Sequence, residues 1–181
     1  LAGVYREVSD SEYFLLVRAK LRAMLGTAGD AVKDFEGLLR DKKFVSEGAT
    51  RFGLAVALAR KRDWVAAEQE LLTAKRMKIS TAILERQLAE VKLAQGDVSA
   101  ALAIYREAMV RYPLNQALNY GYGQALIKVK RYDEALKFAD MQLLSYPQDV
   151  RLHKMRAESY AGLGRGAQQH QALAEVFSLQ G

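Results

Sequence analysis

The chain has no cysteine and only two prolines among its 181 residues. Without cysteine it has no disulfide framework, cysteine-ligated zinc site, iron–sulfur cluster or thiol nucleophile. Its longest apolar stretches, such as residues 53–59, are much shorter than the roughly 20 residues that a membrane-spanning helix needs. The scarcity of proline, together with 28 alanines and 25 leucines, predicts a mostly helical protein with a packed core.

The formal net charge is only moderately positive, at +6. This excess permits nucleic acid, anionic lipid or an acidic protein as a partner and selects none of them. The start of the chain contains neither the basic region nor the long apolar region of a signal peptide, and it does not begin with methionine. We therefore expect a segment of a longer protein, whose targeting signal would lie upstream.

The sequence repeats itself at a regular interval. The only two prolines follow tyrosine, in the pairs Tyr112-Pro113 and Tyr146-Pro147, and an alanine stands at the same distance before each of them. The interval between the two pairs is a period of about 34 residues, and such self-similarity predicts a repeat architecture. The same step, or a slightly longer one at the start of the chain, connects Ala31, Ala67, Ala101, Ala135 and Gln169.

Apolar residues recur at helical spacing between the turns, as in Leu84, Leu88 and Val91. Proline ends the second helix of a repeat because it lacks an amide donor and disfavours the helical conformation of the residue before it. Each repeat is thus expected to be a helix, a short turn, a second helix and a stop. The turn signals in phase with the repeat are Gly29-Asp30, Arg62-Asp63-Trp64, Gly96-Asp97-Val98, Arg131-Tyr132-Asp133 and Gly164-Arg165-Gly166.

A two-helix unit of this length with small residues at fixed positions resembles the tetratricopeptide repeat, whose pattern includes A-x3-F and a proline near the end. The resemblance is clearest at Ala101, Tyr105, Ala108 and Pro113. It implies an all-α, right-handed TPR-like superhelical solenoid of about five helix–turn–helix repeats, each stabilised by stacking on its neighbours. The expected repeats are residues 12–45, 48–81, 82–115, 116–149 and 150–181, preceded by a linker or leading segment at residues 1–11.

No constellation of residues in the sequence indicates catalysis. The only two histidines, His153 and His170, belong to different expected helices and lack the converging ligands that a zinc site needs. A G-x-G-x-G run is formed by Gly162, Gly164 and Gly166, but a helix rather than a strand is expected before it, which disfavours a nucleotide-binding loop. We expect no catalytic, cofactor-binding or metal-binding residue in this chain.

Three basic clusters offer a different function. Stacked repeats would align two of them along one edge, where a polyanion such as RNA or lipopolysaccharide would bind with strong salt dependence. Helical repeats that read RNA need base-selecting side chains in each unit, and no regular pair of that kind is present. A solvated edge is the favoured interpretation, and nucleic acid is not the expected partner. The clusters are Arg60-Lys61-Arg62, Lys75-Arg76 with Lys78, and Lys128 with Lys130-Arg131.

The first helices of stacked repeats line a concave groove that binds protein segments. The resemblance assigns this role to about the fifth, ninth and twelfth positions of each repeat. The candidates mix aromatic anchors with charged side chains, which are types favoured in recognition hot spots, and the alternative is that several pack against an additional helix. They are Lys20, Phe52, Val56, Arg86, Glu90, Tyr120, Gln124, Lys154 and Glu158.

A clamp for a C-terminal carboxylate, which some members of the family use, is not reproduced. Leu16 and Phe52 stand where basic or amide side chains would be expected. Capture of a chaperone tail is therefore not expected of this chain.

A narrower resemblance, to the C-terminal repeat region of BepA-like periplasmic zinc metallopeptidases, rests on residues 156–165 (RAESYAGLGR), 168–175, 177–181 and 15–39. It implies a parent protein with an N-terminal signal and an HExxH zinc domain, and gives this array the role of an arm that docks substrates or partners. No residue here matches the HExxH motif, so no zinc ligand or catalytic glutamate can be assigned. Zinc is expected only in the missing catalytic domain.

These observations predict a non-catalytic protein–protein interaction domain. The main hypothesis is the docking arm of a periplasmic metalloprotease involved in outer-membrane protein quality control, with outer-membrane proteins or their assembly machinery as partners. A free-standing adaptor or scaffold is the alternative, followed by a polyanion binder. The expected location is the periplasm under the main hypothesis, and otherwise only a soluble protein is expected.

Overall fold

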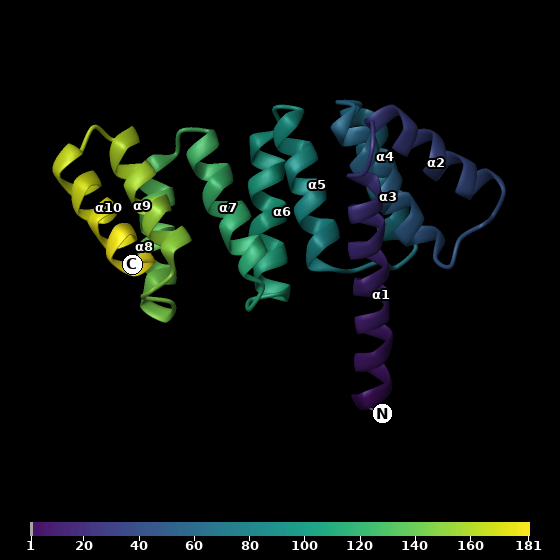
Figure 1. The fold of residues 1–181 in the computed structure, drawn as a ribbon, viewed down its shortest axis with the longest axis horizontal. Helices are drawn as coiled ribbons and strands as arrows, with labels where there is room; N and C mark the ends of the chain where they lie inside the picture. Colours follow the sequence, from purple (N-terminus) through teal and green to yellow (C-terminus); the bar gives the residue numbers. More distant parts are fainter. Residues whose placement is uncertain (1) are drawn as a thin grey trace. The chain divides into compact units, whose positions relative to one another are not determined.

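The computed structural model describes the backbone of residues 2–181 and the side chains of residues 11–181. This part of the chain contains ten α-helices and no β-strand, which confirms the predicted all-α fold (Figure 1). Among these residues, no helix combines the length and the apolar character that a membrane span requires. The helices are α1 (Ala2–Ala23), α2 (Ala28–Arg40), α3 (Glu47–Arg60), α4 (Trp64–Arg76), α5 (Ala82–Ala94), α6 (Val98–Arg111), α7 (Gln116–Lys128), α8 (Tyr132–Ser145), α9 (Val150–Gly162) and α10 (Gly166–Gln180).

The helices form two compact units, which divide within α6 between Ile104 and Tyr105. In the first unit, α3 packs against both α2 and α4, and α4 packs against α5. In the second unit, α8 packs against α7 and α9, while α9 also packs against α7 and α10. Within each unit these helices therefore pack on helices next to them in the chain, as stacked helical hairpins require.

The bounds of the helix pairs compare as follows with the residue ranges of the expected repeats. The last three pairs lie within the expected limits, and the pair α3–α4 begins one residue early, at Glu47. The leading segment expected at residues 1–11 belongs to α1 from Ala2 onward, and Leu1 lies outside the described residues.

The turn inside each of the last four repeats has the same hydrogen-bond pattern. At the end of α3, the amide of Arg62 donates to the carbonyl of Ala59 at 3.0 Å, and the amide of Asp63 donates to the carbonyl of Leu58 at 2.9 Å. This pair of bonds is the Schellman motif, which satisfies the last carbonyls of a helix and requires a left-handed residue. The left-handed residues of the four turns are Arg62, Gly96, Lys130 and Gly164, with φ of 64°, 85°, 62° and 70°.

The first two repeats lack the Tyr-Pro pair and end their second helices with a similar turn. Lys42 follows α2 with φ of 52°, and Lys78 follows α4 with φ of 63°. At the latter turn, the amide of Ile79 donates back to the carbonyl of Ala74 at 3.3 Å. A left-handed lysine thus stops these two helices, whereas proline follows α6 and α8.

Side chains cap the N-termini of most helices. The Asp63 carboxylate accepts from the amide of Ala66 at 3.3 Å, and the Asp97 carboxylate accepts from the amide of Ala100 at 3.1 Å. Each of these aspartates follows the left-handed residue of a Schellman turn directly, so one short segment both closes a helix and opens the next. A cap of this kind typically contributes about 1 kcal/mol.

The prediction of a turn at Gly29-Asp30 is wrong. Both residues lie in the first turn of α2, because Thr27 caps this helix and its hydroxyl oxygen accepts from the amide of Asp30 at 3.1 Å. The first repeat departs from the regular period of the others, which displaced the expected turn by several positions.

Small residues lie where helices approach each other closely. Ala67, Ala101 and Ala135 are each 0% exposed, as the repeat pattern predicts. A Cβ atom added to Gly53 in α3 would lie 2.4 Å from the Phe35 ring of α2, so only glycine fits beside that ring. The aromatic residue of one repeat therefore packs on the first helix of the next.

Helix α1 packs differently from the first helices of the other repeats. It packs mainly on α3, reaches α5, and touches its own partner α2 only slightly (Figure 1). Its end is fixed by Arg60 of α3, whose guanidinium donates to the carbonyl of Ala23 at 2.6 Å and to the carbonyl of Gly26 at 3.0 Å. The Glu12 carboxylate accepts a hydrogen bond from the backbone of Ser80, just before α5. Helix α1 therefore lies across the first helices of the two following repeats.

Candidate functional site

The second unit exposes several of the predicted groove residues on two neighbouring helices. Helices α7 and α9 pack side by side, and both are the first helix of their repeat. Gln124 of α7 and Lys154 and Glu158 of α9 are exposed, while Tyr120 of α7 is half-buried. We call these four residues the α7–α9 surface.

Tyr120 is held in place by the N-terminal end of α9. Its hydroxyl donates to the carboxylate of Asp149, which caps α9 and accepts from the amides of Arg151 and Leu152 at 2.8 and 3.2 Å. The Arg151 guanidinium lies 4.9 Å from the centre of the Tyr120 ring. Burial, followed by the bond to Asp149, raises the pKa of Tyr120 to about 12, so the residue is a neutral and fixed aromatic anchor.

The first unit presents its predicted groove residues differently. Arg86 and Glu90 of α5 bind each other, with Nε 3.0 Å from the carboxylate oxygen, and both are half-buried. Lys20 of α1 is also half-buried. The Arg86–Glu90 pair neutralises its own charge, which leaves little net attraction for a charged ligand.

Phe52 and Val56 lie in the core and not on a groove surface. They are 0% and 3% exposed, and they belong to the same buried cluster as Leu16 of α1. The physical reason is the position of α1, which packs on α3. These two residues do occupy the positions that the repeat pattern indicates, but the helix that covers them belongs to the same chain.

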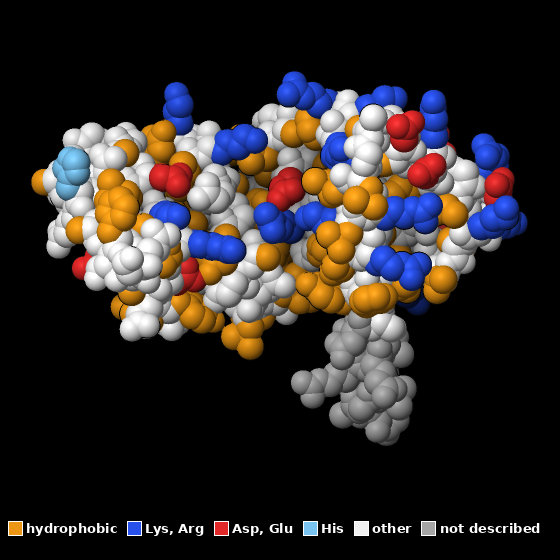
Figure 2. Space-filling model, in the orientation of Figure 1, with side chains coloured by type: hydrophobic (Ala, Val, Ile, Leu, Met, Phe, Trp, Pro, Cys, Tyr) orange, Lys and Arg blue, Asp and Glu red, His pale blue; other side chains and the backbone are white. Residues whose placement is uncertain are grey.

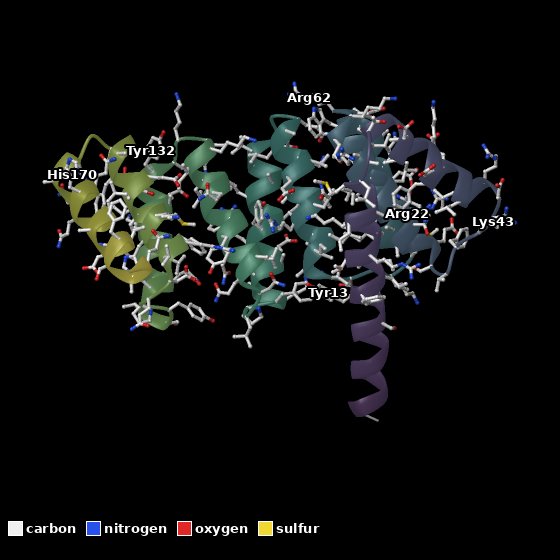
Figure 3. The ribbon with its side chains drawn as sticks, viewed as in Figure 1. Tyr13, Arg22, Lys43, Arg62, Tyr132 and His170 are labelled. Carbon is white, nitrogen blue, oxygen red and sulfur yellow. The ribbon has the colours of Figure 1, made fainter. Side chains whose placement is uncertain are left out.

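A cavity of about 340 Å³ opens between α1, α2 and the start of α3. The repeat pattern of the sequence does not predict it, because the cavity results from the unusual packing of α1. Its apolar walls include Leu15, Phe35 and Phe44, and its basic rim includes Arg22 and Lys43. Figure 2 shows Lys and Arg side chains gathered over this part of the first unit, and Figure 3 shows Arg22 on the side of α1 that faces α2.

Several members of the basic clusters have structural roles. Arg60 binds the end of α1, and Lys75 binds the buried Glu85 at 3.0 Å. Arg62 and Lys130 are the left-handed residues of their turns, and Figure 3 places Arg62 at such a turn. Cations are favourable at helix C-termini because the helix dipole is negative there. Turn geometry and helix ends therefore account for much of this charge pattern.

The histidines and the glycine run also have structural surroundings. His153 is buried, and its Nε2 lies 2.8 Å from the carbonyl of Pro147, whereas His170 is exposed on α10 (Figure 3). Within residues 11–181 no three potential ligands gather into a metal site. Gly162 packs against the ring of Tyr132, and Gly164 is the left-handed residue of a turn.

A comparison with protein families matches residues 92–158 to the tetratricopeptide repeat. This part of the chain is similar to the tetratricopeptide repeat, as its repeat pattern predicts. The match spans α6, α7, α8 and most of α9, which together carry the whole α7–α9 surface with its aromatic anchor. A comparison with curated proteins found no match.

Several solved structures resemble most of the chain. MamA from strain MSR-1 has a TM-score of 0.65 at 16% identity, covering 94% of this chain and 97% of that chain. MamA from Desulfovibrio magneticus RS-1, residues 41 to the end, has a TM-score of 0.60 at 18% identity, covering 73% of this chain and 75% of that chain. YrrB, described as a tetratricopeptide repeat protein with an unusual peptide-binding site, has a TM-score of 0.63 at 16% identity, covering 92% and 84%. At these identities the likeness shows the fold alone.

The narrower resemblance to BepA-like metallopeptidases receives no support from these comparisons. The same holds for the periplasmic location and for outer-membrane partners, which followed from that resemblance alone. Stacked helical repeats account for the periodic alanines, for the helix pairs and for the first helices α7 and α9 lying side by side.

Proposed function

We propose that the chain is a non-catalytic interaction module that binds an extended protein segment on the α7–α9 surface. The observation that carries the proposal is the fixed Tyr120 ring beside exposed polar and charged side chains on two adjacent first helices. Rigid aromatic anchors near charged residues are typical of recognition hot spots. A free-standing scaffold fits the similar structures better than a docking arm does, and the arm of a metalloprotease rests on the sequence resemblance alone.

The charges of the surface favour a ligand with both signs of charge. Lys154 and Glu158 are one turn apart on α9 and both exposed. Tyr120 adds an apolar face that carries no charge, since its pKa is raised to about 12. We infer that a bound segment places an apolar or aromatic side chain near Tyr120 and polar groups along α9.

Peptides selected from a random phage-display library against the whole chain test this proposal. Lys154→Glu and Gln124→Arg should each weaken the selected peptides about tenfold or more, which corresponds to about 1.4 kcal/mol. The control is Lys137→Glu, which makes the same charge change at an exposed position of α8 and should change affinity less than about twofold. The proposal would be contradicted if Lys154→Glu and Lys137→Glu reduced peptide affinity equally. It would also be contradicted if none of the three substitutions changed the affinity of the selected peptides.

A further inference from the structure

We propose that the cavity of the first unit is a second recognition site, which binds a peptide segment where a carboxylate adjoins a large apolar side chain. The site is built by α1, α2, α3 and the loop between α2 and α3. It shares no residue with the α7–α9 surface, so it extends the proposed function and does not depend on the ligand bound there.

The charge at the cavity is of one sign. Its lining includes Arg18, Arg22 and Lys43 and contains no aspartate or glutamate among the described residues. None of these three cations forms an ion pair within residues 11–181. Arg18 and Arg22 are four residues apart on α1, where like charges repel each other and destabilise a helix. A bound carboxylate would remove this repulsion.

The ends of the helices do not require these cations. A basic residue in the last turn of a helix is favourable, which applies to Arg22 but not to Arg18, one turn earlier. The carbonyls of Ala23 and Gly26 at the end of α1 are already bound by Arg60. The two arginines at the cavity are therefore available to a ligand, and arginine binds a carboxylate through two parallel hydrogen bonds.

Apolar side chains form part of the cavity wall, beside the polar and basic ones. Leu15, Phe35, Leu38 and Phe44 contribute to this part, and the Arg22 guanidinium lies 5.7 Å from the centre of the Phe35 ring. A positive charge is thus fixed beside an apolar wall. The volume of about 340 Å³ lies at the lower end of the range of ligand pockets, about 300–1,000 Å³. It suits one or two side chains of a peptide.

This combination favours a peptide over other anions. Nucleic acid is bound through many phosphate contacts along a charged surface, and three cations around one apolar cavity do not provide such a track. A membrane surface would require an exposed apolar helix face with a basic border, whereas the apolar walls here line a cavity. A carboxylate next to a leucine or phenylalanine side chain matches both the charge and the walls.

The test uses the whole chain and a fluorescein-labelled peptide with the centre Glu-Leu-Phe-Glu between Gly-Ser flanks, followed by fluorescence anisotropy. Arg18→Glu and Arg22→Glu should each weaken binding about tenfold or more, because each replaces an attraction by a repulsion. Lys33→Glu is the matched control, since it makes the same charge change on the exposed face of α2 in the same unit and should alter affinity less than about twofold. Circular dichroism melting checks that each variant is folded.

Two altered peptides distinguish the contribution of the cations from that of the apolar side chains. Replacing both Glu residues by Gln, or Leu and Phe by Ser, should each weaken binding about tenfold. If the peptide with Ser in place of Leu and Phe bound as tightly as the parent peptide, charge alone would explain the attraction and the proposal would be overturned. Absence of binding by the parent peptide at low salt, or equal effects of Arg18→Glu and Lys33→Glu, would also overturn it.

A photo-reactive peptide locates the contact directly. With benzoylphenylalanine in place of phenylalanine, cross-links should fall on α1, α2 or the loop between α2 and α3. Cross-links confined to α7 and α9 would overturn this inference and would support the proposed function, so the two outcomes are distinguishable. Anionic lipid vesicles are tested in the same assay. If the protein bound them more strongly than the peptide, and Arg18→Glu abolished that binding, the ligand would be a lipid surface and the proposal would be overturned.

Discussion

Glycine and an aromatic ring occupy matching places in successive repeats. The Phe35 ring packs on Gly53, and the Tyr105 ring packs on Gly121, where an added Cβ atom would lie 2.9 Å from Cε1 of the ring. In both pairs the ring comes from the second helix of one repeat and the glycine from the first helix of the next. The cost of glycine in a helix, about 1 kcal/mol relative to alanine, is therefore offset by close packing between repeats.

Gly53→Ala should destabilise the protein despite the higher helix propensity of alanine. The new methyl group would overlap the Phe35 ring, and overpacking of this kind costs about 1–3 kcal/mol. The control is Gly37→Ala in α2, where the nearest atom to an added Cβ is the end of Arg40 at 3.7 Å. This change should stabilise the protein by about 0.5–1 kcal/mol. Urea unfolding followed by circular dichroism measures both, and a stabilising Gly53→Ala would contradict the packing argument.

Tyr120 should make the free energy of unfolding depend on pH in the alkaline range. Its folded pKa is raised from 10.0 to about 12, so the folded state holds this proton more tightly than the unfolded state does. The contribution to stability is fully present below pH 10 and is lost as pH rises through about 12. Tyr120→Phe should reduce the loss of stability between pH 10 and 12, because this variant lacks the titrating hydroxyl. Urea midpoints measured across this range test the sign, and identical pH profiles would contradict it.

At the scale of the elements, the turns explain where cations stand in the sequence. Arg62 and Lys130 adopt left-handed conformations at places where two other repeats have glycine. A left-handed conformation costs a residue with a side chain roughly 1–2 kcal/mol, which the Schellman hydrogen bonds and the helix dipole partly offset. Basic residues in these turns are thus compatible with a purely structural role.

Arg62→Gly should stabilise the protein by about 0.5–1 kcal/mol, because glycine adopts the left-handed conformation without strain but loses more entropy on folding. The adjacent Lys61 is the matched control, since its φ of −78° is ordinary for any residue. Lys61→Gly should destabilise the protein by up to about 1 kcal/mol. Thermal melting compares the two variants, and destabilisation by both would show that the turn is not strained at Arg62.

The repeat pattern predicted most of the helices but not the position of α1. Periodic alanines and the Tyr-Pro pairs indicate local structure and close crossings, which depend on residues near each other in the chain. Phe52 and Val56 stand at groove positions of their repeat, yet α1 packs on α3 and buries them. Which face a leading helix covers depends on packing between distant segments, and the periodicity carries no information on it. The cavity follows from the same packing and was missed for the same reason.

At the scale of the molecule, the division into two compact units predicts separate responses to damage. Leu16 of α1 and Leu152 of α9 are each 0% exposed, and they lie in different units. Replacing a buried leucine by alanine typically costs about 2–5 kcal/mol. In repeat proteins each repeat is stabilised by its nearest neighbours, so the loss should remain local.

Hydrogen exchange measured by mass spectrometry tests this expectation. Leu16→Ala should accelerate amide exchange in α2 and α3 and leave α9 and α10 close to wild type. Leu152→Ala is the reciprocal control and should give the opposite pattern. Equal acceleration throughout the chain in both variants would mean that the two units unfold as one.

The turns within two of the repeats cannot take up an extra residue, because one aspartate takes part in both helix ends. Asp63 and Asp97 each end one helix and begin the next, so an inserted residue would rotate the following helix by about 100°. That rotation would carry Ala67 or Ala101 away from its crossing. Grafted loops, affinity tags or reporter domains therefore belong at the junctions between repeats, such as residues 112–115, where proline already separates one hairpin from the next.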